Sequence, residues 1–287
     1  MRLRDSLDYG EAQLRAGPHP NRARRDAETL LLHHLGKNRA WLLAHLDDEF
    51  AGCRSIGYIG LIDRRVAGEP IQYITGETEF YGLPFHVTPD VLIPRPETEH
   101  LVERVLELAG QISASRRTTL EILDIGTGSG AIAVALAHHL PAAHITATDL
   151  SAATLDIARK NAGRNAVADC IRFLQGDLLA PVSGEVFDLI VSNPPYVPST
   201  DRSTLSVEVR EHEPALALFA GADGLDIYRR LIPSAFSALA HGGFLLLEIG
   251  YGQAPAIRAL LNESSFSGIQ FVPDLQCIPR VAVSVRP

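Results

Sequence analysis

The chain of 287 residues is long enough for one large domain and a small one, and its hydrophobic content of 46% is ordinary for a globular protein. Acidic residues outnumber basic ones by 34 to 26, so the net charge of -8 excludes the globally basic surface of a typical nucleic-acid-binding protein. Cys53, Cys170 and Cys277 are scattered, which excludes a disulfide framework and a CxxC metal site. No stretch approaches the roughly 18 apolar residues of a membrane span, and we expect a cytoplasmic protein.

Residues 1–69 have a helical pattern. Apolar side chains recur there at steps of three and four residues, at Leu30, Leu31, Leu35, Trp41, Leu42, Leu46, Ile59, Ile62 and Val66. Asn21 and Asn38 are of the residue type that commonly begins helices. We predict a small separate helical domain. It is either a stabilising appendage or a module that docks a partner, and the pattern leaves both open.

Residues 70–94 have a different texture, with short aromatic and β-branched runs broken by glycines. This texture predicts a β-hairpin linker. The linker leads into Pro94-Arg95-Pro96-Glu97, where two prolines favour an extended arm and Glu97 opens an amphipathic helix. The arm is either a rigid domain connector or a device that places Arg95 over an active site.

From Leu120 onward, strand and helix patterns alternate. The predicted strands are 120–124, 145–149, 171–174, 187–191 and 244–249, and the predicted helices are 131–139, 152–161, 227–240 and 254–261. This alternation predicts an α/β fold with a mostly parallel sheet and helices on both faces. Two β-rich runs near the end, 269–272 and 281–285, have no helix between them, so we expect an antiparallel pair at one end of the sheet. The last predicted domain is 95–287.

The apolar run 187–191 ends abruptly at Asn193-Pro194-Pro195-Tyr196, because proline cannot donate to a strand ladder. An amide is thus held at the carboxyl end of a strand, where open parallel sheets bind their ligands. The Asn193 side-chain oxygen and the Pro194 carbonyl can accept the two hydrogens of a planar NH2 group, and the Tyr196 ring can stack upon it. The stretch therefore predicts a pocket for an amide or an aromatic amine.

A glycine-rich turn, Gly126-Thr127-Gly128-Ser129-Gly130, follows the first strand of the alternating region. Its glycines let the backbone approach a ligand closely, but the spacing GxGxG differs from the GxGxxG of dinucleotide-binding proteins. Asp149 ends the second strand and can accept both hydroxyls of a ribose, while Asp177 follows the third and can accept from an adenine amino group. Together with the Asn193 pocket, these residues predict a class I, Rossmann-like S-adenosylmethionine-dependent methyltransferase.

Further segments carry a resemblance to a known family. They are Gly68-Glu69-Pro70-Ile71-Gln72-Tyr73-Ile74, Phe80-Tyr81-Gly82, Val91-Leu92-Ile93-Pro94-Arg95-Pro96-Glu97-Thr98-Glu99 and Leu247-Glu248-Ile249-Gly250. With the glycine turn and the Asn-Pro-Pro-Tyr stretch, they make the chain closely resemble the HemK/PrmC family, essentially from end to end. The arm is the specific part, because Asn-Pro-Pro-Tyr alone is shared with amino methyltransferases that act on DNA adenine. The resemblance implies methylation, by S-adenosyl-L-methionine, of the glutamine side-chain amide in the Gly-Gly-Gln motif of peptide-chain release factors, in support of translation termination.

The resemblance also implies roles for single residues. Those expected to act on the glutamine amide are Asn193, Pro194 and Tyr196, with Pro195, Arg95 and Glu97 completing the substrate side. Those expected to bind the cofactor are Gly126, Thr127, Gly128, Ser129, Gly130, Asp149, Asp177, Leu178 and Asn193, and no metal is expected. Two positions depart from the family: Leu178 stands where some relatives have an aromatic ring, and Cys277 stands where glycine is expected.

An amide nitrogen is a poor nucleophile, because its lone pair is delocalised into the carbonyl. Asn193 and the Pro194 carbonyl would accept hydrogen bonds from both N–H groups of the amide and so orient its nitrogen. We therefore expect catalysis mainly by positioning. Methylation of a nucleic-acid base amine is an alternative, which the acidic balance and the lack of a second, basic domain disfavour. A silent cofactor-binding scaffold is another, disfavoured because Asn193 and Tyr196 are both intact. The expected partners are release factors; we expect no direct nucleic-acid contact, no membrane association and a monomer.

Overall fold

The computed structural model describes residues 2–50, 52–115 and 119–287, and the chain divides into two compact units. The helical unit comprises Met1–Glu77 together with Leu205–His212, and the sheet unit comprises Thr78–Thr204 together with Glu213–Pro287. The division therefore falls later than the predicted boundary at residue 69. It also assigns a segment that follows the Asn-Pro-Pro-Tyr stretch to the helical unit, which no local pattern indicates.

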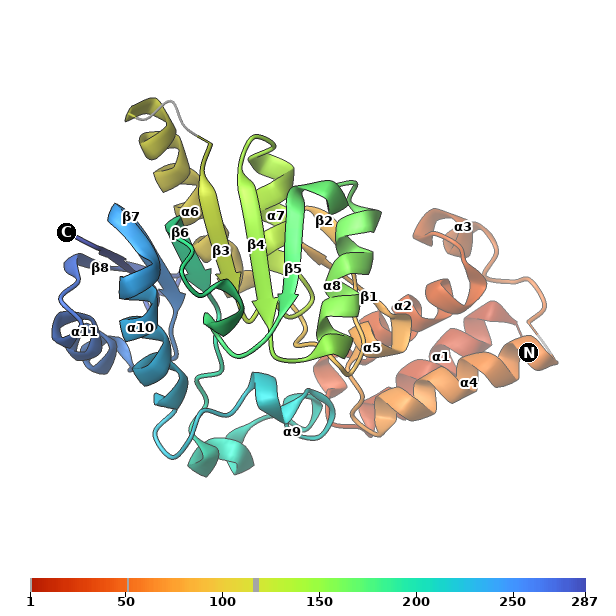
Figure 1. Cartoon of the computed structure of the whole chain (residues 1–287). Coiled ribbons are helices and arrows are strands. Elements are labelled where there is room, and N and C mark those ends of the chain that lie inside the picture. The colour runs from red at the N-terminus through yellow and green to blue at the C-terminus, as the bar shows by residue number, and fades with distance from the viewer. Residues whose placement is uncertain (1, 51, 116–118) are drawn as a thin grey trace. The chain divides into compact units, whose positions relative to one another are not determined.

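The helical unit consists of short helices (Figure 1). Buried apolar side chains from residues 3–74 form its core. Its helices are α1 (Leu3–Arg15), α2 (Ala23–Leu35), α3 (Arg39–Ala44), α4 (Cys53–Val66), α5 (Ile71–Thr75) and α9 (Val207–His212). Asn38 caps α3 as predicted, because its side-chain oxygen accepts from the backbone N–H of Trp41 at 2.9 Å. The prediction for Asn21 is wrong: this residue lies inside a 3-10 turn over Pro20–Arg22, where the proline presets the backbone, and α2 begins only at Ala23.

A buried arginine explains why α9 belongs to the helical unit. The side chain of Arg65 is 1% exposed, and its Nε donates to Asp26 Oδ2 at 2.7 Å. Its Nη1 donates to the Glu69 carbonyl at 2.9 Å and also to the carboxylate of Glu208, which lies on α9. Because removal of one partner from a buried ion pair typically costs about 3–5 kcal/mol, this arrangement anchors residues 205–212 to the helical unit.

The predicted hairpin linker over 70–94 is only partly right. Its first β-rich run, Ile71–Thr75, forms α5 instead, and Ile74 is buried in the core of the helical unit. Burial of that side chain outweighs the strand propensity of the run. The hairpin itself consists of β1 (Glu77–Phe80) and β2 (Leu83–His86), and the residues between them, Tyr81 and Gly82, have φ of 52° and 72°. Two successive positive φ values are typical of the two-residue turn that matches strand twist.

The sheet unit contains a seven-stranded sheet in the order β5-β4-β3-β6-β7-β9-β8 (Figure 1). Its strands are β3 (Glu121–Ile125), β4 (His144–Asp149), β5 (Ile171–Gln175), β6 (Phe187–Ser192), β7 (Leu239–Glu248), β8 (Ser267–Pro273) and β9 (Pro279–Val285). The pairs among β3 to β7 are parallel, whereas β9 is antiparallel to both β7 and β8. The predicted fold class, with an antiparallel pair at one end, is confirmed.

Helices cover both faces of this sheet. They are α6 (Pro96–Ser115), α7 (Ala131–His139), α8 (Ala152–Arg164), α10 (Asp226–Ala238) and α11 (Ala254–Glu263). Neighbouring residues of a strand point to opposite faces, so Ile122 joins the apolar cluster under α6 and α7, and Leu123 joins the one under α10 and α11. The helix α6 begins at Pro96, one residue before the predicted start at Glu97, because proline suits the first position of a helix. In the described ranges, no helix has both the length and the apolar character that a membrane crossing needs.

The turn between β8 and β9 forms without the expected glycine. Cys277 adopts a φ of 61°, which is the left-handed conformation that glycine would provide at low cost. The carboxylate of Asp274 stabilises the turn, because its Oδ1 accepts from the backbone N–H groups of Gln276 at 2.8 Å and Ile278 at 3.0 Å. The departure at Cys277 therefore leaves the turn intact.

Candidate active site

The carboxyl ends of β3 and β6 lie side by side where the strand order reverses, since β4 and β5 follow on one side and β7 on the other. Ser192, the last residue of β6, donates from its hydroxyl to the carbonyl of Ile125 at 2.7 Å, which ties the two strand ends together. The glycine turn directly follows β3, and Asn193 directly follows β6. The two strongest sequence motifs are thus neighbours at the crevice where open α/β sheets bind ligands.

The glycine turn has a conformation that other residues adopt only at a cost. Gly126, Gly128 and Gly130 have φ of 70°, 57° and 82°. The N–H groups of Gly126 and Thr127 both donate to the carbonyl of Thr148 on β4, at 2.8 and 3.0 Å. A Cβ added at Gly126 would meet nothing within 4 Å, whereas one at Gly130 would lie 3.2 Å from Ala158. The turn therefore faces open space at Gly126 and packs against α8 at Gly130.

Asp149 is held next to this turn at the end of β4. Its Oδ2 accepts from the backbone N–H of Gly128 and its Oδ1 from that of Ser151, each at 3.0 Å. Burial raises the pKa of the Asp149 carboxyl, and these backbone hydrogen bonds oppose the rise. Each carboxylate oxygen can accept more than one hydrogen bond, so capacity is left for the hydroxyls of a ribose.

Asp177 and Leu178 follow β5. The carboxylate of Asp177 forms an ion pair with Arg230 of α10, so the side chain expected to bind adenine is engaged by a guanidinium. Leu178 has a φ of 50°, its carbonyl accepts from the Thr148 hydroxyl at 3.2 Å, and its side chain packs against the core below α10. Leu178 is thus linked to the strand that carries Asp149, and the adenine role of Asp177 stays a prediction.

Asn193 and Tyr196 are supported by two residues that the sequence reasoning did not single out. The Asn193 Nδ2 donates to the Thr98 hydroxyl at 3.1 Å, and that hydroxyl donates to Glu248 Oε2 at 2.6 Å. The Tyr196 hydroxyl donates to the other oxygen of Glu248 at 3.3 Å. Thr98 and Glu248 both lie in segments that carry the family resemblance, which is the signal that could have pointed to them.

The backbone of the stretch is also held in place. The Gln253 side chain donates from Nε2 to the Tyr196 carbonyl at 3.0 Å, while its Oε1 accepts from the Gly250 N–H at 2.8 Å. The next residue, Val197, donates from its N–H to the Leu218 carbonyl at 2.8 Å. Asn193 is therefore presented by a segment with fixed support on both sides, as positioning catalysis requires.

The arm before α6 is fixed by a salt bridge. Arg95 Nη2 lies 2.6 Å from Glu213 Oε1, and the side chain of Glu213 is 1% exposed. Glu97, in the first turn of α6, is half-buried, and its charge contributes to raising the pKa of Glu248. Both residues thus lie in the sheet unit with Asn193, while their roles toward a substrate stay predictions.

Asp124, the carboxyl group beneath the glycine turn, is fully buried and accepts from the Thr127 hydroxyl at 2.6 Å. Burial raises its pKa to about 7, above the ordinary 3.8. The folded chain therefore binds the proton of the Asp124 carboxyl group more tightly than the unfolded chain does. The stability that the protonated group contributes to the fold is lost as pH rises from about 4 through 7.

We expect Asp124→Asn to escape that loss, because asparagine keeps the acceptor oxygen for Thr127 without a charge. Relative to the wild-type chain, its free energy of unfolding should rise between pH 5 and pH 8, by on the order of 3 kcal/mol. Urea denaturation of both proteins at a series of pH values measures this difference. Parallel stability curves would show that Asp124 does not titrate in this range.

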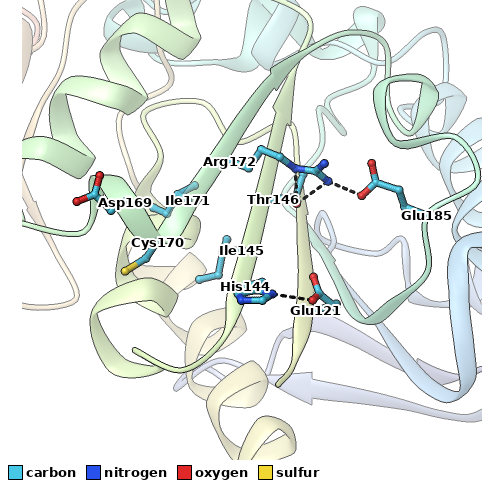
Figure 2. A pocket seen from close by; sticks show the side chains of 9 residues that line it. All are labelled: Glu121, His144, Ile145, Thr146, Asp169, Cys170, Ile171, Arg172 and Glu185. Atoms are coloured by element: carbon cyan, nitrogen blue, oxygen red, sulfur yellow. Dashed lines mark hydrogen bonds and ion pairs between the residues drawn. The ribbon is translucent and has the colours of Figure 1, made fainter. Parts of the chain in front are cut away.

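A separate hollow of about 410 Å³ lies at the amino ends of β3, β4 and β5, opposite the carboxyl ends that carry the glycine turn and Asn193 (Figure 2). Glu121 and His144, the first residues of β3 and β4, line it and hydrogen-bond to each other at 2.8 Å. Arg172, also in its lining, bonds to Thr146 and Glu185. The hollow thus lies at the amino ends of the strands, away from the glycine turn, and Glu121 pairs there with His144 and Arg172 with Glu185.

Comparison with known proteins gives two family models and many similar sequences. The PrmC N-terminal domain matches residues 5–76, and the Methyltransferase small domain matches residues 107–210. A release factor glutamine methyltransferase of Koribacter versatilis is 42% identical, and the match covers 100% of this chain and 99% of that protein. One of Moorella thermoacetica is 45% identical over 96% of this chain and 95% of its own length.

Among solved structures, a Thermus thermophilus 16S rRNA N2 G1207 methyltransferase, in complex with AdoMet and guanosine, has a similar fold. Its TM-score is 0.53 at 22% sequence identity, and the match covers 74% of this chain and 50% of that one. At this level of identity the similarity concerns the fold of the sheet and its helices.

Proposed function

The chain belongs to the release factor glutamine methyltransferase family, and on that premise we propose that it methylates the side-chain amide nitrogen of the glutamine in the Gly-Gly-Gln motif of peptide-chain release factors. The observation that carries this proposal is the Asn193 amide at the end of β6, whose nitrogen is bound by Thr98. Its side-chain oxygen is then left to accept from a substrate NH2 group. The site suits a planar amide, as the sequence predicts.

S-adenosyl-L-methionine is the proposed methyl donor, and S-adenosyl-L-homocysteine the product. When bound, the donor supplies an electrophilic methyl group on a positively charged sulfonium. The residues at the carboxyl edge of the sheet fit such a group, because the glycine turn faces open space at Gly126 and Asp149 lies beside it with acceptor capacity. The residues 126–130 would hold the methionine part, Asp149 the ribose, and Asp177 with Leu178 would border the adenine.

The chain's own contribution to the reaction is orientation of the amide. The Asn193 side-chain oxygen and the Pro194 carbonyl would each accept a hydrogen bond from one N–H group of the glutamine amide. The Tyr196 ring would lie against the plane of that amide. This arrangement aims the nitrogen lone pair in one direction and favours pyramidalisation as the nitrogen attacks. The proton becomes acidic only after methyl transfer, so the mechanism assigns no strong base. Arg95 and Glu97 would close the substrate side.

A release factor is a protein, so the proposed function also needs a docking surface outside the amide pocket. We assign that role to the helical unit, which matches the PrmC N-terminal domain. The proposal places the chain in the cytoplasm as a monomer, where release factors act in translation termination. Direct binding of nucleic acid and of membranes is not part of it.

Radiolabel transfer tests the proposed function. Labelled S-adenosyl-L-methionine is incubated with the chain and an intact release factor, in parallel with the same factor carrying Gln→Ala in its Gly-Gly-Gln motif. We expect label on the first factor alone. Equal labelling of both factors would overturn the glutamine assignment, and label on DNA or RNA with none on either factor would favour methylation of a base amine.

A further inference from the structure

Glu248 is a buried carboxylate behind the Asn-Pro-Pro-Tyr stretch. It is 2% exposed, at the carboxyl end of β7. One of its oxygens accepts from the Thr98 hydroxyl at 2.6 Å, and the other accepts from the Tyr196 hydroxyl at 3.3 Å. Its backbone carbonyl accepts from the Tyr228 hydroxyl of α10 at 2.6 Å. One residue of the central sheet thus connects the first turn of α6 with the segment that follows β6.

The direction of these hydrogen bonds follows from what each group can donate. A threonine hydroxyl carries a single hydrogen, and an ionised carboxylate can only accept. The Thr98 hydrogen therefore goes to Glu248, and Thr98 offers only lone pairs to Asn193. The atom of Asn193 that lies 3.1 Å from Thr98 must then be the nitrogen of its amide. The amide oxygen takes the other side, away from Thr98.

We propose that Thr98 and Glu248 are positioning residues for methyl transfer, which together hold the Asn193 amide with its oxygen toward the substrate. The inference rests on the proposed function, in which that oxygen accepts an N–H of the substrate glutamine. An Asn193 amide turned by half a rotation would present its own NH2 group to the substrate NH2 group, and two donors cannot bond to each other. Glu248 also holds the Tyr196 ring through its second oxygen.

Protonation of Glu248 removes the constraint on this direction. Burial raises the pKa of the Glu248 carboxyl group to about 7, and the negative charge of Glu97 adds to the rise. The hydrogen bonds from Thr98 and Tyr196 and the positive charge of Arg280 oppose it. The Tyr228 hydroxyl, on α10, donates to its backbone carbonyl. Below this pH the carboxyl group gains a hydrogen and can itself donate to Thr98. Since only the ionised form dictates the direction, turnover should increase as pH rises through about 7.

Side-chain amide NMR tests the arrangement in the protein alone, without cofactor or substrate. The Asn193 NH2 resonances of the ¹⁵N-labelled chain are assigned by their absence from Asn193→Ala. We expect them to titrate with a midpoint near pH 7 in the wild-type chain and to lose this titration in Glu248→Gln. In Thr98→Val, which keeps the shape but removes the hydroxyl, they should shift at every pH.

Kinetics on the release factor provide the second readout. Thr98→Val should lower kcat by about 10-fold or more and leave the Kd of the cofactor nearly unchanged. Losses of this size are found when a residue that orients a metal-binding side chain through a hydrogen bond is replaced, and Thr98 orients Asn193 in the same way. Thr98→Ser keeps the hydroxyl and should restore turnover. Thr146→Val is the matched control, because it removes another buried threonine hydroxyl of the sheet unit, which accepts from Arg172 and has no contact with Asn193 or Glu248.

The outcomes separate the two proposals. Wild-type turnover in Thr98→Val, or Asn193 resonances that do not respond to pH, would overturn the positioning role while the methyltransferase assignment stands. A wild-type chain that labels no release factor, yet shows the titrating Asn193 resonances, would overturn the proposed substrate and leave the hydrogen-bond arrangement supported.

Discussion

Replacement of Asn193 by alanine is expected to lower the turnover of release-factor methylation by about 10²-fold or more, and to affect cofactor affinity far less. The reason is that alanine removes the oxygen that would accept an N–H of the glutamine amide, while the glycine turn and Asp149 are left unchanged. Measurement of kcat at saturating release factor, with calorimetric titration of S-adenosyl-L-methionine, separates the two effects.

Two further variants sharpen this test. Asn193→Asp keeps an acceptor oxygen but cannot donate to Thr98, so it should lose part of the activity that the alanine variant loses. Asn262→Ala, at an exposed position of α11, is the control for removal of an asparagine. Normal turnover in Asn193→Ala would show that positioning by this amide is not the source of catalysis.

Replacement of Gly224 by alanine should destabilise the chain and lower turnover together. Gly224 has a φ of 75°, and an added Cβ would lie 2.2 Å from the carbonyl oxygen of Tyr196 and 3.0 Å from Gln253 Nε2. The nearer atom belongs to the backbone and cannot rotate away, so the segment that carries Asn193 and Tyr196 has to shift. We expect a loss of about 2–4 kcal/mol in the free energy of unfolding, from strain and overpacking combined. A shift of 1 Å at the site can cost on the order of 10²-fold in rate.

Gly252→Ala is the matched control for this variant. Gly252 has a φ of 78°, close to that of Gly224, but an added Cβ there would meet nothing within 4 Å. It should show the conformational cost alone, about 1 kcal/mol, with turnover preserved. Chemical denaturation and kcat measured on both variants isolate the clash with Tyr196. Equal losses in the two would mean that the close approach of Gly224 to Tyr196 has no consequence.

Several features of this protein could be predicted from its sequence, because they depend on residues that are neighbours in the chain. Alternating strand and helix patterns predicted the sheet from β3 onward, and the glycine turn and Asn193 were predicted to lie at strand ends. Periodicity and turn chemistry are local properties, so they are legible in a single sequence. The parallel arrangement then brought both motifs together at the carboxyl ends of β3 and β6, the side of the sheet where open α/β folds bind ligands.

Other features were decided only by contacts between residues far apart in the chain. The run that begins at Ile71 forms a helix because Ile74 is buried in the helical unit, although its composition favours a strand. Residues 205–212 belong to the same unit because Glu208 pairs with the buried Arg65, 143 positions away in the sequence. No local pattern reports that a charge will be buried.

The same distinction applies within the candidate site. The sequence by itself determined which residues could face a glutamine amide and a cofactor. Their chemical types, and their positions directly after predicted strands, depend only on residues that are close in the chain. Only the tertiary structure decided how Asn193 is held, because Thr98 and Glu248 are 150 positions apart and meet through the pairing of β6 with β7 and the packing of α6. A buried carboxylate must be hydrogen-bonded, and the choice of its partners depends on which elements the fold brings together.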